Sequence, residues 1–190
     1  MEKVFGHQIK TVEQLKAFIT GQVERAKSLP IKDELYSELE KELTDLVLKQ
    51  ELTPEEEARA EQIADWFNDA TIKAETLVDL RMALEELGCD EDYIKYVIEH
   101  ENAHGNKASS LKANHYGYAL TLSYDEAEDF YIVHPLAMIN MPSSWSEWRK
   151  NRVHIACTRA PEDYGNELSQ NDSDCLIALT RVKANLKKKL

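Results

Sequence analysis

Cysteine is scarce in this sequence, and its few copies form no pattern. Only Cys89, Cys157 and Cys175 occur among the 190 residues, and no two of them make a C-x-x-C pair. An odd, widely spaced set excludes a disulfide framework and a zinc ribbon, and it fits reduced thiols that pack inside a cytosolic protein. We therefore expect a cytoplasmic location.

Long apolar runs are also missing. The first ten residues, MEKVFGHQIK, lack the apolar core of a signal peptide, so we expect the mature protein to start at Met1. No window approaches the roughly 20 apolar residues that a membrane-spanning helix needs. The sequence contains no repeat, low-complexity tract or flexible linker. These absences predict a globular protein with no membrane partner.

Positive charge is in short supply. Lysine and arginine number 23 against 35 aspartate and glutamate residues, which gives a formal net charge of −12. A chain of this sign repels phosphate backbones, so we expect no nucleic-acid partner. The hydrophobic content of 43% is ordinary for a globular protein, and the length suffices for one core or two modest lobes.

The first half of the chain is dominated by helical patterns. Apolar residues recur there at spacings of three and four, with charged residues between them. The predicted helices cover residues 12–29, 32–50, 54–67 and 70–87. Thr53 is a predicted N-cap, because Pro54 suits the first helical position and Glu56 completes a capping box. Gly88 is placed to end the fourth helix in the left-handed conformation.

The second half mixes helix and strand. A helix is predicted after GCDED, followed by two strand-like runs, HYGYALTLSY and DFYIVHPLAMI, which the polar segment YDEAED joins as a hairpin. Two further helices follow, the first with a Ser144–Glu147 capping box. The predicted fold class is α+β and predominantly α-helical. We place a soft division between a helical lobe, residues 1–88, and a second lobe, residues 89–190.

One short motif in the second half can carry chemistry. Residues 100–104, HENAH, have the order H-E-x-x-H. On a helix, His100 and His104 lie one turn apart on the same face, about 6 Å from each other, so their ring nitrogens can converge on one ion. Glu101 lies about 100° further round the helix, from where it can reach a water on that ion.

HENAH resembles the zinc signature of the zincin metallopeptidases, in which a helix supplies two histidine ligands and a glutamate that acts as general base. Residues 125–142, DEAEDFYIVHPLAMINMP, are more loosely similar to compact gluzincins, in which a Glu-Ala-rich segment supplies the third ligand. The resemblance implies Zn²⁺ bound by His100 and His104, Glu101 as the catalytic base, and a peptide or protein substrate. We also expect the motif helix to pack on the small antiparallel hairpin.

A third metal ligand must come from elsewhere in the chain, and His134 is one candidate. If the helix runs to about residue 113 and the chain returns as a strand, the level of His104 is regained near residue 119. A hairpin centred on Glu126 then sets residue 119 opposite residue 133 or 134. On that geometry His134 stands over the histidine pair.

Neither the third ligand nor the function is decided by the motif. If a short loop feeds a helix instead of a strand, Glu126 or Glu128 can fold back to the metal, and His115 is a further candidate. The first possible function is that of a zinc-dependent hydrolase with Glu101 as general base, whichever residue is the third ligand. The second possible function is that of a non-enzymatic protein, with or without a structural metal, whose acidic helices in residues 11–87 bind a protein partner.

Overall fold

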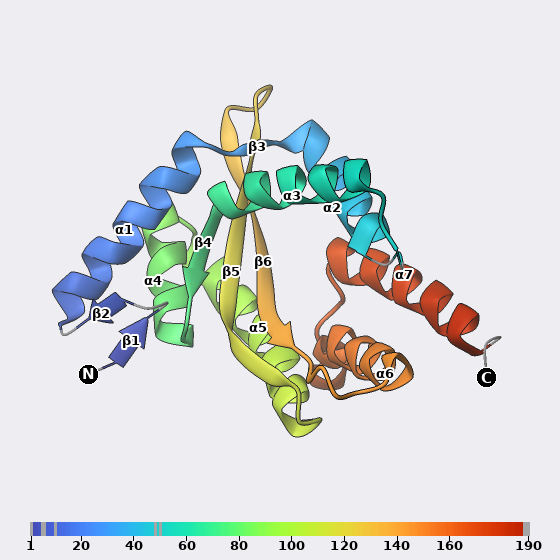
Figure 1. The fold of residues 1–190 in the computed structure, drawn as a ribbon. Coiled ribbons are helices and arrows are strands. Elements are labelled where there is room, and N and C mark those ends of the chain that lie inside the picture. The colour runs from blue at the N-terminus through green and yellow to red at the C-terminus, as the bar shows by residue number, and fades with distance from the viewer. Residues whose placement is uncertain (1, 5–6, 10, 48, 50, 188–190) are drawn as a thin grey trace.

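A small mixed sheet lies in the middle of the molecule, with helices on both of its faces (Figure 1). The computed structural model describes residues 2–4, 7–9, 11–47, 49 and 51–187. The helices are α1 (Val12–Ser28), α2 (Asp33–Val47), α3 (Pro54–Asp69), α4 (Leu77–Leu87), α5 (Glu91–Ser110), α6 (Glu147–Thr158), the short 3-10 helix η1 (Ala160–Tyr164) and α7 (Gln170–Lys187). The strands are β1 (Glu2–Val4), β2 (His7–Ile9), β3 (Ile31–Lys32), β4 (Thr71–Ala74), β5 (Asn114–Asp125) and β6 (Phe130–Asn140). The predicted α+β class, mostly helical, is confirmed.

Local signals set several helix ends. Thr53 caps α3, with Pro54 in the first turn and a reciprocal hydrogen bond from Glu56, as predicted. Gly88 ends α4 in the left-handed region, with φ of 84°. The predicted Ser144–Glu147 box is wrong, because α6 begins at Glu147 and its cap is Ser146. A cap two residues later leaves Glu147 in the first position of the helix instead of the third.

The fourth predicted helix starts too early. Residues 71–74 form strand β4, which pairs antiparallel with β5, and the helix follows only at Leu77. Strand β3 was not predicted either, and it pairs with β5 in parallel. Pairing with a distant strand outweighs the local helical pattern here. The division at residue 88 stays a prediction, and one sheet draws strands from both sides of it.

The hairpin of β5 and β6 sets which residues face which side of the sheet. Asp125 pairs with Phe130 at the tip, and Thr121 therefore lies opposite His134. Side chains alternate between the two faces of a strand. Leu120 and Leu122 point to the face that α1, α4 and α5 cover, whereas Ser123 points to the face of α2.

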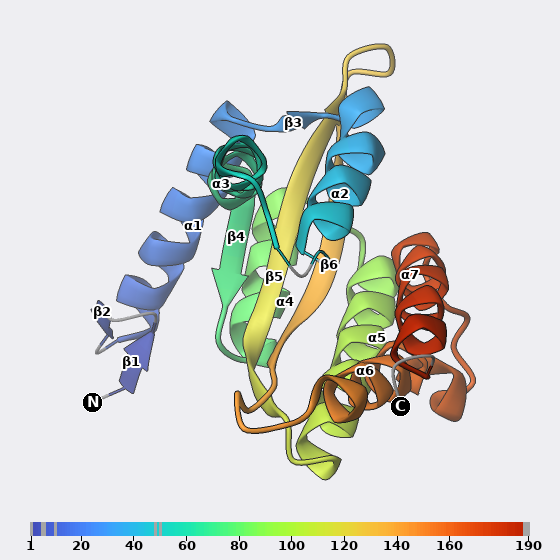
Figure 2. The same cartoon turned by 45° about the vertical axis from the view of Figure 1, so that its right-hand side comes forward.

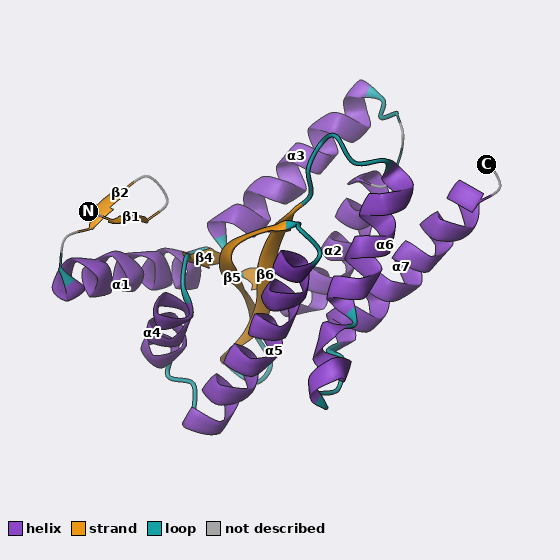
Figure 3. Ribbon diagram, turned by 90° about the horizontal axis from the view of Figure 1, so that it is seen from below, coloured by secondary structure: helices purple, strands orange, loops and turns teal. Residues whose placement is uncertain are grey.

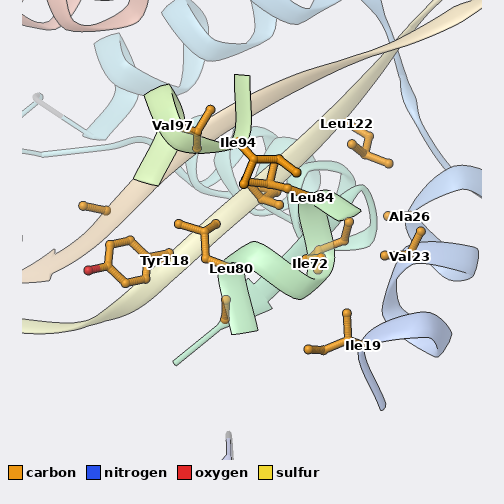
Figure 4. Packing of buried hydrophobic residues seen from close by; sticks show 14 residues of the cluster. Ile19, Val23, Ala26, Ile72, Leu80, Leu84, Ile94, Val97, Tyr118 and Leu122 are labelled. Carbon is orange, nitrogen blue, oxygen red and sulfur yellow. The ribbon is translucent and has the colours of Figure 1, made fainter. Parts of the chain in front are cut away.

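The main core lies between that first face and its three helices (Figure 4). Ile72 of β4, Leu84 of α4, Val97 of α5 and Leu120 of β5 are all fully buried there. Burial of each such aliphatic side chain stabilises the fold by about 1.5–3 kcal/mol. Because Val97 sits on the sheet-facing side of α5, the residues one turn further along the helix are also drawn inside.

Candidate metal centre

The H-E-x-x-H residues lie inside the molecule on α5. Asp90 caps the helix. His100, Glu101 and His104 are only 2%, 3% and 7% exposed. One nitrogen or oxygen atom from each lies within 4.8 Å of the others, so this buried group could hold a metal ion. The predicted i, i+4 convergence of the two imidazoles is present in the structure.

A carboxylate from the far end of the chain meets both histidines. Asp172 lies in the first turn of α7, a helix that packs against α6 (Figure 2), as Figure 3 also shows from below. Its Oδ2 atom is 2.8 Å from Nε2 of His100, and its Oδ1 atom is 3.3 Å from Nε2 of His104. Two imidazole nitrogens and one carboxylate therefore converge from two helices.

The hydrogen-bond partner of Nδ1 shows which nitrogen of the neutral His104 ring carries the hydrogen. Nδ1 of His104 lies 2.8 Å from the backbone oxygen of Cys157 on α6. A carbonyl oxygen only accepts, so Nδ1 carries the hydrogen, and Nε2 of the neutral ring has none. Nε2 and the Asp172 carboxylate would then present lone pairs to each other. Either a proton or a metal ion between them removes that repulsion.

The pKa shifts of Asp172 and His104 favour an ion pair between the two side chains. Burial acts to raise the pKa of the Asp172 carboxyl, but hydrogen bonds from His100 and His104 hold it well below its usual range. Burial likewise acts to lower the pKa of His104, yet Asp172 and Glu101 outweigh burial and raise it. These directions favour a proton on His104 in the absence of a metal, and a metal ion would have to displace that proton.

Glu101 has one oxygen that is free to act. Burial raises the pKa of its carboxyl, although the neighbouring His104 and His100 act in the opposite direction. The backbone N–H of Ala137 on β6 donates a hydrogen bond to this carboxylate. Among the described residues, its Oε2 atom has no hydrogen-bond partner. A buried carboxylate with an open acceptor beside two imidazoles can accept a proton from a molecule bound there.

His134, the first candidate for the third ligand, is not brought to the histidine pair. Its Nε2 atom lies 2.8 Å from Oγ of Ser123, and its ring stacks on Tyr36 of α2 at 3.7 Å between centroids. The register of the hairpin differs from the predicted one. Ala119 pairs with Leu136, not with residue 133 or 134, because the tip lies further along the chain than Glu126. The side chain of His134 consequently points to the α2 face, away from α5.

Neither glutamate of the hairpin reaches the histidine pair, and His115 has a packing role. Glu126 lies at the exposed hairpin tip, where it forms a 2.8 Å ion pair with Lys32, and Glu128 is exposed beside it. His115 packs against Gly105, with its ring filling the space that a Cβ would need. The chain does return as a strand after α5, so the loop geometry that favoured a glutamate ligand is not realised.

Asp172 is the residue that sequence reasoning missed. Ser169 and Asp172 have the S-x-x-D spacing of a helix start, which precedes the apolar run of α7. That signal places Asp172 in a first turn but says nothing of what the turn packs against. The Cys157 carbonyl, which orients His104, has no side-chain signature at all.

Comparison of the chain with protein-family models, with curated proteins and with solved structures found no match in any of the three. Within the described residues, no helix has both the length and the apolar character to cross a membrane. What the chain does must therefore be inferred from the chemistry of its own residues.

Proposed function

We propose that this protein is a zinc-dependent hydrolase whose metal is held by His100, His104 and Asp172. The observation that carries the proposal is the Asp172 carboxylate 3.3 Å from the Nε2 atom of His104, which has no hydrogen of its own in the neutral ring. Two imidazole nitrogens and one carboxylate oxygen are a donor set that zinc accepts, and three protein ligands leave a fourth position open.

Glu101 is the proposed general base. When bound, zinc lowers the pKa of a water ligand and polarises a carbonyl oxygen. The free Oε2 atom of Glu101 would take the proton from the attacking water, while Ala137 holds the carboxylate in place. A base works best when its pKa approaches the working pH, and burial moves the pKa of Glu101 in that direction. The similarity of HENAH to zincins favours a peptide bond as the substrate.

A structural or regulatory metal is the second candidate, and one observation favours it. The side chains of the proposed ligands are enclosed: Asp172 is the most exposed of them, at 14%. Structural zinc sites are closed in this way, whereas catalytic sites keep a position open to substrate. The two candidates share the metal and differ in whether Glu101 acts on a substrate.

Metal analysis and one substitution separate the two functions. Protein purified without an affinity tag and offered zinc at neutral pH should retain one ion per chain, and it should cleave members of a fluorogenic peptide library. Glu101→Gln should keep the zinc and lose about 10²–10⁴-fold in rate. Glu99→Gln, an exposed residue of the same helix, is the matched control and should leave both unchanged.

The possible results separate the two candidate functions. Cleavage that survives Glu101→Gln at the parent rate would exclude Glu101 as the base. Tight zinc without cleavage by the parent would leave the structural role. A chain that takes up no zinc would contradict both.

A further inference from the structure

We propose that zinc binding and docking of α7 are one coupled event, and that Ser169 is the positioning residue that couples them. The proposal rests on the metal site proposed above, since Asp172 is the ligand that α7 contributes. It goes beyond that site because it assigns a conformational role to the metal and a function to a residue that does not touch it.

Ser169 holds the Asp172 carboxylate from one side. Its backbone N–H and its hydroxyl both donate to Oδ2 of Asp172, at 3.1 and 2.7 Å. In return, the Asp172 N–H donates to Oγ of Ser169 at 3.1 Å, which makes a reciprocal cap for α7. Oδ1 is left directed at His104. The same side chain thus closes the first turn of α7 and faces the metal position.

Few polar contacts beyond these fasten α7 to the rest of the described chain. The helix packs mainly against α6, where Asn151 donates to the Leu179 carbonyl. A hydrogen bond between the side chains of Asn171 and Tyr36 links it to α2. Figure 2 shows α7 beside α6, on the edge of the molecule and away from the sheet. Thr158 of α6 also lies 3.9 Å from Sγ of Cys175. In the described part of the chain, the ion pairs between α7 and α5 are those of Asp172 with the two histidines.

The docked position of α7 sets the Asp172 carboxylate beside two buried imidazoles, 2.8 and 3.3 Å from the Nε2 atoms of His100 and His104. A metal ion held by all three residues would bind the docked helix more tightly than the undocked one. Metal binding is accordingly expected to favour the docked helix.

Hydrogen exchange of the full chain tests the coupling directly. Amides of α7 should exchange more slowly with zinc than in chelator, by up to about 100-fold when free zinc is 100 times its Kd. Amides of α1, which packs against α4 and β4 instead of α7, are the internal control and should change far less. Zinc should give α7 no protection in Asp172→Asn. Equal exchange of α7 with and without stoichiometrically bound zinc would overturn the proposal.

Zinc affinity, measured by competition with a chromogenic chelator, tests Ser169. Ser169→Ala should weaken binding by about 10–100-fold, as loss of a ligand-orienting partner does, and Ser169→Thr should restore it. Ser146→Ala removes the equivalent cap from α6 and should lower stability without changing affinity. Parent affinity in Ser169→Ala would refute the positioning role.

These outcomes are distinct from those of the proposed function. Zinc-dependent protection of α7 in a chain that cleaves nothing would support the coupling and reject the hydrolase. Peptide cleavage by a chain in which zinc leaves the hydrogen exchange of α7 unchanged would support the hydrolase and reject the coupling.

Discussion

Nε2 of His100 lies 2.8 Å from Oδ2 of Asp172, across 72 positions of sequence. The contact joins α5 to α7 and turns a local two-histidine motif into a three-donor group. Both residues are largely buried, so the pair is a feature of the interior rather than a surface ion pair, which would contribute little.

The ligand set can be checked by single substitutions. His100→Ala and Asp172→Asn should each abolish stoichiometric zinc uptake, because each substitution removes one of the three proposed ligands. His134→Ala, which removes one of the third-ligand candidates taken from the sequence, should leave uptake intact. Equilibrium dialysis with elemental analysis provides the measurement, and circular dichroism should show helical content close to that of the parent. Loss of zinc in His134→Ala alone would reverse the assignment.

The burial of α5 against the sheet predicts a large stability effect at Val97. Val97→Asp would place an unpaired charge at a fully buried position, so the free energy of unfolding should fall by about 3–5 kcal/mol. Val78→Asp, at a position that is 63% exposed on α4, should change it by no more than about 0.5 kcal/mol. Urea unfolding measures both. Similar values for the two variants would mean that this side of α5 is solvated.

The contact between Gly105 and His115 predicts a non-additive pair. A Cβ on residue 105 would lie 2.6 Å from Cε1 of His115, so Gly105→Ala should destabilise the protein by about 1–3 kcal/mol. In a His115→Ala background the same change should be neutral, or stabilising by up to about 1 kcal/mol, because alanine favours helix. A double-mutant cycle of unfolding free energies gives the coupling. Additive effects would show that the two residues do not meet.

The buried ring of His134 predicts a pH dependence of stability. Burial lowers the pKa of His134 to about 4, while Asp33 opposes that shift, and an unfolded histidine titrates near 6.5. Between about pH 4 and 6.5 the unfolded chain binds the extra proton, so this contribution to stability is complete above about pH 6.5 and is lost as the pH falls towards 4.

His134→Gln cannot titrate and should flatten that dependence. The slope should decrease by at most about 1.4 kcal/mol per pH unit, the value for one proton. Unfolding in chelator from about pH 4.5 to 7.5 compares the two proteins without any metal contribution. Parallel curves would indicate that His134 is charged or exposed when folded.

Short-range features were predictable because they depend on residues within a turn or two of each other. The cap at Thr53, the left-handed end at Gly88 and the shared face of His100 and His104 all follow from helix geometry. Strand β4 was missed for the opposite reason: Ile72 is stabilised by its pairing with Leu120 on β5, which no local pattern reveals.

The sequence by itself determined the mostly helical composition, the position of α5, and the pair of imidazoles one turn apart with a glutamate beside them. Tertiary structure alone decided which carboxylate from a distant part of the chain meets the two imidazoles. The register of the β5–β6 hairpin places the His134 side chain on the α2 face of the sheet. The packing of α6 and α7 brings Asp172 to His100 on α5. Helix periodicity acts over a few residues, whereas the meeting of His100 and Asp172 depends on the packing of every element between them.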